Sequence, residues 1–316
     1  MKATGRHFIT LSDVRQQELD RIFDLARTLK ADMAAGKRPK LLEGRVLGLI
    51  FEKMSLRTRV SFEAGMAQLG GATIFLEDQH IGFGKRESVA DISRVLSSMV
   101  DAIAFRAKKH SSVTQLASYS YCPVINALTD RAHPCQALAD LLTIQEEFGH
   151  LNGLRIAWVG DSNNVAASLI AASAMMGAQV VVSSPADYQF SSEEVARLTA
   201  VEKRPGFSLE FEPDPKKAVA GADVIYTDVW VSMGQESEEA VRCKVFAPYQ
   251  VNGDLMAATG KKETIFLHCL PARRGLEVTD EVMDGPQSRI VEQAANRMHA
   301  QKGLLVWLMT EAKADA

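Results

Sequence analysis

Short apolar runs alternate with amphipathic helical stretches along most of the chain. The runs occupy residues 46–51, 72–76, 102–105, 124–125, 156–159, 180–182, 224–226 and 265–267. Between the first two, Phe62, Met66 and Leu69 fall on one stripe at helical spacing. Such alternation is typical of βαβ units and predicts an α/β fold built on parallel sheets.

A polar connection at residues 149–153, with glycine at both ends, separates a long helical stretch from a new apolar run. With 316 residues and 47% hydrophobic content, the chain can bury two modest cores. We therefore expect two doubly wound domains, residues 1–148 and 149–291, each with a central parallel sheet of about four strands and joined by interdomain helices. The last stretch, about 292–316, predicts a long helix that packs back on the first domain.

Charge and cysteine content exclude several classes of protein. The 36 Lys+Arg nearly balance 39 Asp+Glu, and no lysine-rich run indicates a nucleic-acid or membrane surface. No stretch approaches the roughly 20 apolar residues of a membrane helix, and the first residues lack a signal-peptide core, so we expect a cytoplasmic protein. The four cysteines, Cys122, Cys135, Cys243 and Cys269, show neither a CxxC pair nor metal-ligand spacing, which predicts reduced thiols and no structural zinc.

The segment Ser55-Leu56-Arg57-Thr58-Arg59 directly follows the first apolar run. Ser55 is placed to cap the next helix, whose free N–H groups and positive dipole end favour an anion. Hydroxyls and planar guanidinium groups suit phosphate oxygens. A capped surface helix with solvated arginines explains the spacing equally well, and the P-loop pattern is absent.

Other unusual polar residues each follow an apolar run. They are Arg106, His133, Gln136, Asp161, Asn164, Asp228, His268 and Cys269. Because ligands of doubly wound sheets lie beyond the carboxyl ends of the strands, we expect these loops to converge on one edge and to form a site for a small phosphorylated donor.

Two of these residues allow more than one interpretation. His133 precedes Pro134 at a predicted helix start, where a neutral imidazole either polarises a carbonyl group or only caps the helix. Cys269 has no local pattern of a general base, so a small buried thiol is a better interpretation than a nucleophile.

Four motifs, in this order, resemble those of the ornithine carbamoyltransferases. They are Ser55-Leu56-Arg57-Thr58-Arg59, His133-Pro134-Cys135-Gln136, Asp228-Val229-Trp230-Val231-Ser232-Met233-Gly234 and His268-Cys269-Leu270-Pro271. The first two resemble carbamoyltransferases in general, and the last two narrow the resemblance to the ornithine branch. The similarity runs from about residue 7 to the C-terminal helix, including Asn296-Arg297-Met298-His299.

The resemblance implies transfer of the carbamoyl group of carbamoyl phosphate to the δ-amine of L-ornithine, giving L-citrulline and phosphate in arginine metabolism. It implies no metal or organic cofactor. The residues that it assigns to carbamoyl phosphate are Ser55, Leu56, Arg57, Thr58, Arg106, His133, Gln136, Cys269, Leu270 and Arg297. Their hydroxyl, guanidinium and imidazole groups would form an oxyanion hole.

The resemblance assigns ornithine to Asn164, Asp228, Ser232 and Met233, with Cys269 and Asp228 orienting the δ-amine. The implied catalytic set is Thr58, Arg106, His133, Asp228 and Cys269. The δ-amine must be neutral to attack the carbonyl carbon directly, so we expect activity to rise toward alkaline pH.

Two departures from the family pattern bear on this interpretation. Position 56 is Leu, where many members carry Thr, but only its backbone is expected to face phosphate. The loop at residues 80–88 corresponds to a segment that reaches a neighbouring subunit's site, with Gln79 or Lys85 as candidates for that contact. If the loop crosses over, the chain works as a homotrimer or a multiple of trimers.

Other functions remain open at this level. The acceptor could be acetylornithine, putrescine or aspartate, although an acceptor without the α-amino or α-carboxylate group leaves Asp228 and Ser232 unpartnered. A dinucleotide-binding oxidoreductase is disfavoured because residues 158–164 contain one glycine instead of GxGxxG. A non-catalytic paralogue is disfavoured by the intact Arg57, Arg106 and His133.

Overall fold

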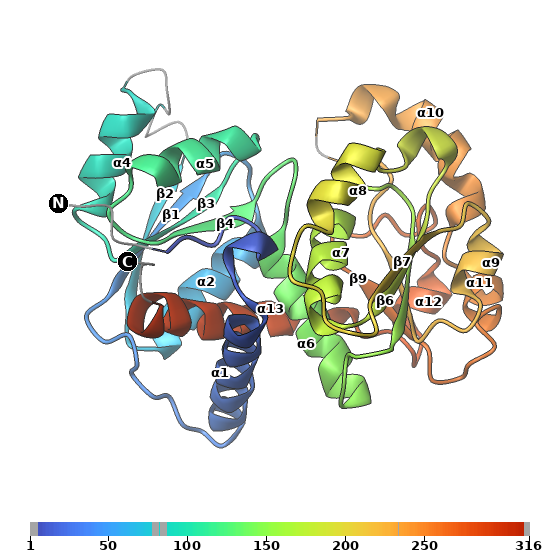
Figure 1. The fold of residues 1–316 in the computed structure, drawn as a ribbon, viewed down its shortest axis with the longest axis horizontal. Helices are drawn as coiled ribbons and strands as arrows, with labels where there is room; N and C mark the ends of the chain where they lie inside the picture. The colour runs from blue at the N-terminus through green and yellow to red at the C-terminus, as the bar shows by residue number, and fades with distance from the viewer. Residues whose placement is uncertain (1–5, 78–81, 83–86, 233, 313–316) are drawn as a thin grey trace. The chain divides into compact units, whose positions relative to one another are not determined.

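The computed structural model describes residues 6–77, 82, 87–232 and 234–312. Its contacts divide the chain into two compact units, Met1–Ala139 with Ala295–Ala316, and Asp140–Ala294. Both boundaries lie within helices, in α6 (Pro134–Phe148) and in α13 (Ile290–Val306) (Figure 1). The second unit extends beyond the expected limits 149–291 because part of each joining helix packs with it.

The first unit contains a four-stranded parallel sheet with the order β2-β1-β3-β4. Its strands are β1 (Val46–Phe51), β2 (Ala72–Glu77), β3 (Ala102–Arg106) and β4 (Val124–Leu128). Its helices, besides parts of α6 and α13, are η1 (Leu11–Asp13), α1 (Gln16–Ala34), α2 (Leu56–Gln68), α4 (Val89–Ser97), α5 (His110–Tyr119) and the terminal turn η5 (Trp307–Glu311). Helices α4 and α5 cover one face of the sheet, and α2 and α13 cover the other (Figure 1).

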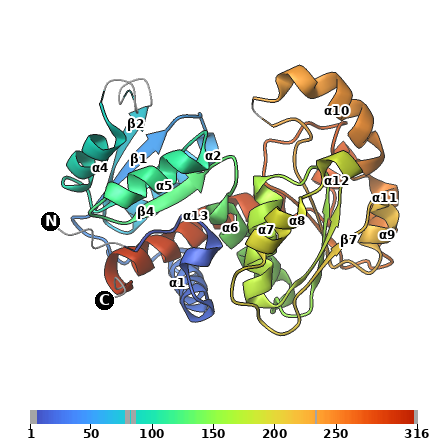
Figure 2. The same ribbon diagram turned by 45° about the horizontal axis from the view of Figure 1, so that its top comes forward.

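The second unit contains a five-stranded parallel sheet with the order β7-β6-β5-β8-β9. Its strands are β5 (Arg155–Val159), β6 (Gln179–Ser183), β7 (Ser208–Phe211), β8 (Val224–Thr227) and β9 (Ile265–His268). Its other elements are α7 (Asn164–Met176), η2 (Ala186–Tyr188), α8 (Ser192–Leu198), α9 (Pro215–Val219), η3 (Glu236–Glu238), α10 (Glu239–Phe246), η4 (Ala247–Tyr249), α11 (Gly253–Ala257) and α12 (Asp280–Asp284). Helices α7 and α8 lie on one side of this sheet, and α9 and α11 on the other (Figure 2).

The predicted α/β class and parallel sheets are confirmed, and each of the eight predicted apolar runs lies in a strand. The ninth strand, β7, was not predicted. It lies at the sheet edge and its side chains are half-buried or exposed, so its sequence carries no continuous apolar run. Among the described residues, no helix is long and apolar enough to cross a membrane.

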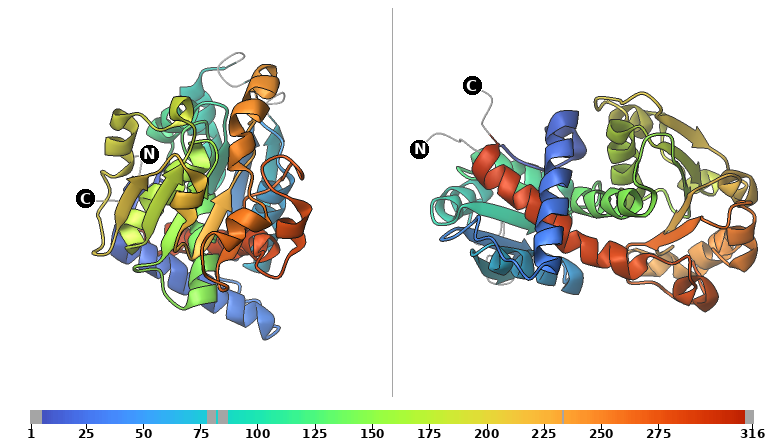
Figure 3. Two further views of the ribbon diagram at one scale, coloured as in Figure 1. Left: turned by 90° about the vertical axis from the view of Figure 1, so that its right-hand side faces the viewer. Right: turned by 90° about the horizontal axis from the view of Figure 1, so that it is seen from below.

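Close packing holds the C-terminal helix on the first unit, where α1 crosses α13 (Figure 3). A side chain at Gly303 would meet the Ile22 carbonyl oxygen and would approach Ala26 N within 2.9 Å. Glycine is therefore required at this crossing. The helix keeps Arg297, one to two turns earlier, in the first unit.

The order of strands fixes where each unit can bind a ligand. In the first sheet the chain adds β2 on one side of β1 and then crosses to add β3 on the other side. In the second sheet the same switch in winding occurs between β5 and β8. Loops that leave neighbouring strands in opposite directions open a crevice at the carboxyl edge, the usual ligand position of doubly wound sheets. Ser55 follows β1, and Arg106 is the last residue of β3. In the second unit Asp161 follows β5 and Asp228 follows β8.

Candidate active site

The N-terminus of α2 lies beyond the carboxyl end of β1. Ser55 caps this helix, as predicted: its hydroxyl accepts from the Thr58 N–H at 3.3 Å and donates to Thr58 Oγ1 at 3.0 Å. The Leu56 side chain is 76% exposed, so Leu56 contributes its backbone N–H, and not its side chain, to this helix N-terminus. First-turn N–H groups lack intrahelical acceptors and, with the positive end of the dipole, attract an anion.

Arg297 is the centre of the polar cluster in the first unit. Its buried guanidinium donates to Thr58 Oγ1 at 2.8 Å and to Gln136 Oε1 at 2.8 Å. The Nη1 atom also lies 3.3 Å from Nε2 of His133. One side chain thus joins α13 to the start of α2 and the start of α6, and brings together residues that are far apart in the sequence.

His133 is neutral in this cluster. Its pKa lies well below the usual 6.5 because the ring is buried and because Arg297, Arg106 and Arg57 contribute positive charge. A guanidinium can only donate, so Nε2 accepts the contact from Arg297 and the ring proton is on Nδ1. A neutral imidazole can therefore donate one hydrogen bond to a ligand oxygen without carrying charge.

Two further arginines of the first unit have different surroundings. Arg106 ends β3 and is 7% exposed, and its charge contributes to the lowered pKa of His133. Arg59, in contrast, pairs with Glu63 at 3.0 Å, and its guanidinium lies 3.7 Å from the centre of the Phe75 ring. The interpretation that grouped Arg59 with the anion site is therefore not supported, because its guanidinium group contacts Glu63 and Phe75 instead.

Asp228 is the centre of a polar cluster in the second unit. It follows β8 directly and is 8% exposed. Its Oδ2 accepts from Asn163 Nδ2 at 2.7 Å, and its Oδ1 accepts from the Val229 N–H at 2.8 Å and from Cys269 Sγ at 3.1 Å. Asn163 also caps α7 through its Oδ1. Three donors therefore fix the orientation of one carboxylate.

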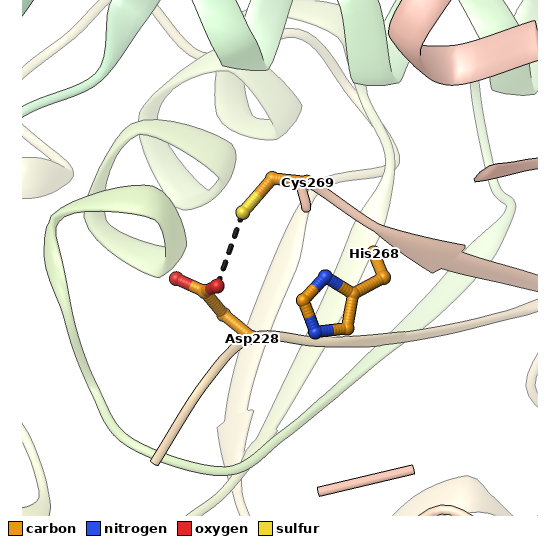
Figure 4. Close-up of side chains that lie close together, drawn as sticks. All are labelled: Asp228, His268 and Cys269. Carbon is orange, nitrogen blue, oxygen red and sulfur yellow. Dashed lines mark hydrogen bonds between the residues drawn. The ribbon is translucent and has the colours of Figure 1, made fainter. Parts of the chain in front are cut away.

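Cys269 and its neighbours lie beyond the carboxyl end of β9. Figure 4 shows the Cys269 thiol directed at Asp228, with the His268 ring beside them. His268 Nδ1 accepts from the Leu270 N–H at 2.9 Å and Nε2 lies 3.1 Å from Glu277 Oε1. Leu270 has φ 59°, the left-handed conformation that residues other than glycine rarely adopt.

Asp228, His268 and Cys269 also bring three potential metal-ligand atoms within 4.8 Å of one another. Both His268 ring nitrogens already contact Leu270 N–H and Glu277, however, and a ring nitrogen that accepts a hydrogen bond is not available to a metal. In this arrangement Cys269 donates to Asp228, and the His268 ring is bonded to Leu270 and Glu277 instead.

The remaining residues named from the sequence are less completely described. Asn164 is the first residue of α7 and is half-buried, and Ser232 is half-buried with its N–H bonded to Gln235 Oε1 at 3.0 Å. Met233, Gln79 and Lys85 lie outside the described residues.

Asn163 and Arg242 belong to the polar cluster of the second unit but were not identified from the sequence. Arg242 is buried on α10 and donates to Asp161 Oδ2 and to the Trp230 carbonyl, both at 3.0 Å, and to Glu238 Oε2 at 2.8 Å. It thereby ties the segment before Ser232 to the end of β5. An arginine in an otherwise amphipathic helix gives no signal for such a long-range pair.

The polar clusters of the two units differ in chemistry. The first offers helix N–H groups, guanidinium groups and a neutral imidazole, which suit an anion with a polarised carbonyl group. The second offers an oriented carboxylate beside a thiol, which suits an amine.

Comparison with known proteins agrees with this division. Residues 6–146 match the family described as aspartate/ornithine carbamoyltransferase, carbamoyl-P binding domain, and residues 152–308 match the Asp/Orn binding domain of the same family. A curated ornithine carbamoyltransferase of Carboxydothermus hydrogenoformans is 49% identical over 306 residues, covering 96% of this chain and 98% of that protein.

Solved structures agree as well. The ornithine carbamoyltransferase of Pyrococcus furiosus is 46% identical with a TM-score of 0.93, covering 99% of this chain and 100% of its own. The enzyme of Thermus thermophilus is 41% identical with a TM-score of 0.86, covering 96% and 99%. This chain therefore belongs to the aspartate/ornithine carbamoyltransferase family.

Proposed function

We propose that the chain is an ornithine carbamoyltransferase, which transfers the carbamoyl group of carbamoyl phosphate to the δ-amine of L-ornithine and releases L-citrulline and phosphate. The observation that carries this proposal is the position of Arg297, whose buried guanidinium contacts Thr58, Gln136 and His133 at the N-terminus of α2. The names of the relatives select ornithine as the acceptor.

The first unit supplies most of the donor site in this proposal. Ser55 at the helix cap, the N–H groups of Leu56 and Arg57, the Thr58 hydroxyl and the guanidinium of Arg57 hold the phosphate group. Residues around the carbamoyl group complete the donor site: Thr58, Arg106, His133, Gln136, Cys269, Leu270 and Arg297. The Nδ1–H of His133 and the guanidinium of Arg106 stabilise the oxyanion that develops on the carbonyl oxygen.

The second unit binds the acceptor. Asn164, Asp228, Ser232 and Met233 hold the α-amino and α-carboxylate end of ornithine, while Asp228 and Cys269 orient the δ-amine. The neutral δ-nitrogen attacks the carbonyl carbon, a C–N bond forms, and the C–O bond to phosphate breaks. The nitrogen transfers a proton to an oxygen of the phosphate as phosphate leaves into the arginine-rich site. This chain's residues contribute orientation and electrostatic stabilisation.

Two substitutions test the division of the site. Arg297→Met removes the central guanidinium and is expected to raise the KM for carbamoyl phosphate about 100-fold, since losing a buried charged contact costs 2–5 kcal/mol. Asp228→Asn keeps the shape but loses the charge, and is expected to raise the KM for ornithine while leaving the KM for carbamoyl phosphate within twofold. A reversed pattern, in which Asp228→Asn affects only the donor, would contradict the assignment.

The proposal includes a homotrimer, or a multiple of trimers, in the cytoplasm. The first unit carries large apolar side chains with high exposure: Met54, Leu56, Val60, Ile74 and Met99. Exposed apolar side chains of this number support burial against another copy of the chain. Light scattering after gel filtration should give a multiple of three times 34.5 kDa, and a monomeric mass in the active fraction would contradict this part of the proposal.

A further inference from the structure

Strand β9 is the edge strand of the second sheet and pairs with β8 on one side. Its outer side is occupied by the segment before α13: Phe266 N–H donates to the Gln287 carbonyl at 2.9 Å, and the Phe266 carbonyl accepts from Arg289 N–H at 3.0 Å. His268 lies two residues further along the same side of the strand. Alternate residues of a strand direct their N–H groups to the same side, so His268 needs an acceptor there.

The side chain of Gln293 supplies that acceptor. Its Oε1 accepts from the His268 N–H at 2.9 Å, and its Nε2 donates to Asp140 Oδ1 at 2.7 Å. Gln293 and Asp140 are completely buried, and His268 is 1% exposed. A carboxylate oxygen can only accept and a backbone N–H can only donate, so these partners fix the orientation of the amide.

These bonds hold the backbone on both sides of Cys269. Gln293 holds the N–H of His268 immediately before it, and the His268 ring, itself held by Glu277, accepts the N–H of Leu270 immediately after it. The thiol between them reaches Asp228 at 3.1 Å. Loss of the Gln293 bond would leave the buried N–H of His268 without this acceptor, at the last residue of β9 and directly before Cys269.

We propose that Gln293, held by Asp140, is a positioning residue that sets the place of Cys269 relative to Asp228. This inference rests on the proposed function, because it assigns those two residues to the δ-amine of ornithine. Gln293 does not touch the substrate. It acts through the end of β9, and an error of about 1 Å there can lower the rate about 100-fold.

The test compares two identical substitutions on one helix. Gln293→Met keeps the length and apolar volume of the side chain but makes neither bond. Gln301→Met is the matched control, because Gln301 is also completely buried on α13 and neither of its amide atoms has a hydrogen-bond partner in the described part of the chain. Gln293→Asn, shorter by one methylene, is the second variant should Gln293→Met not fold.

Steady-state kinetics should separate the two positions. Gln293→Met, or Gln293→Asn, is expected to lower kcat/KM for ornithine by tenfold or more and to change the KM for carbamoyl phosphate by a smaller factor, since Cys269 and Leu270 also belong to the proposed donor site. Gln301→Met should change neither value. The inference is overturned if the Gln293 variants keep wild-type kcat/KM for ornithine, or if the KM for carbamoyl phosphate changes by an equal or larger factor. Absence of citrulline from the wild-type protein would instead refute the proposed function.

Discussion

Lys302 is a lysine buried without a carboxylate within hydrogen-bond distance among its described contacts. It lies on α13 with 2% exposure, and its ammonium donates to Gln68 Oε1 at 3.0 Å and approaches the Leu29 carbonyl at 3.4 Å. Burial, with a smaller effect of the Arg38 charge, lowers its pKa from 10.5 to about 8. A charged amine in this position destabilises the fold.

The substitution Lys302→Met removes that charge and keeps an unbranched chain. A pKa of about 8 in place of 10.5 corresponds to roughly 3 kcal/mol of unfavourable free energy for the charged form at pH 7. Loss of the two hydrogen bonds of Lys302 costs about 1 kcal/mol each, which offsets part of the gain from removing the charge. We therefore expect Lys302→Met to stabilise the first unit by about 1 kcal/mol at pH 7.

The sign of the pH dependence follows from the same pKa. Below about pH 8, both the folded and the unfolded chain hold the proton, so the full destabilisation is present. Between about pH 8 and 10.5 the folded protein releases the proton and the unfolded chain retains it, so wild-type stability rises with pH. The advantage of Lys302→Met should therefore shrink by about 1 kcal/mol from pH 7 to pH 9.

Differential scanning calorimetry at pH 7 and pH 9 measures both effects. We expect Lys302→Met to raise Tm by a few degrees at pH 7, roughly 2–4 °C per kcal/mol for a unit of this size, and by much less at pH 9. Lys37→Met is the control, since Lys37 is exposed on the same unit and should give no pH-dependent difference. A lower Tm for Lys302→Met at pH 7, or an advantage that grows toward pH 9, would refute the reasoning.

Two further predictions follow from the ion pairs and from His133. Arg242→Met leaves the Asp161 carboxylate buried without its guanidinium and should lower the free energy of unfolding of the second unit by about 3–5 kcal/mol in urea titrations, whereas Glu238→Gln, at the 56% exposed end of the same network, should cost less than about 1 kcal/mol. Equal losses would contradict this. The rate of citrulline formation should rise between pH 6 and pH 9 as the ornithine δ-amine loses its proton. His133 should add no inflection there because its pKa lies well below 6.5, so an inflection removed by His133→Asn would show that the ring titrates in this range.

Much of the fold could be predicted from the sequence because strands such as β1 and β5 are buried on both faces. Continuous apolar runs such as those of β1 and β5 need no knowledge of distant residues. The cap at Ser55 was equally local, since its hydroxyl accepts a hydrogen bond from the N–H of Thr58, only three residues later in the sequence. Strand β7 was missed because its sequence, Ser208-Leu209-Glu210-Phe211, alternates polar and apolar residues and contains no continuous apolar run, which a half-exposed strand at a sheet edge tolerates.

The site was harder to predict where it depends on pairs distant in the sequence. Asn163 and Asn164 are adjacent, and only the exact start of α7 decides that Asn163 caps the helix and contacts Asp228. Arg242 and Asp161 are separated by 81 residues, and Gln293 and Asp140 by 153. No local pattern indicates such partners, because each is set by the way the elements pack.

The central claim is that ornithine accepts a carbamoyl group from carbamoyl phosphate on this chain. The most direct measurement incubates the wild-type protein with carbamoyl phosphate and, separately, with ornithine, acetylornithine, putrescine or aspartate, and quantifies the carbamoylated product and phosphate. We predict citrulline and phosphate in equal amounts from ornithine, and far slower reaction with the other three acceptors. No citrulline from ornithine, or a faster reaction with one of the other acceptors, would contradict the account.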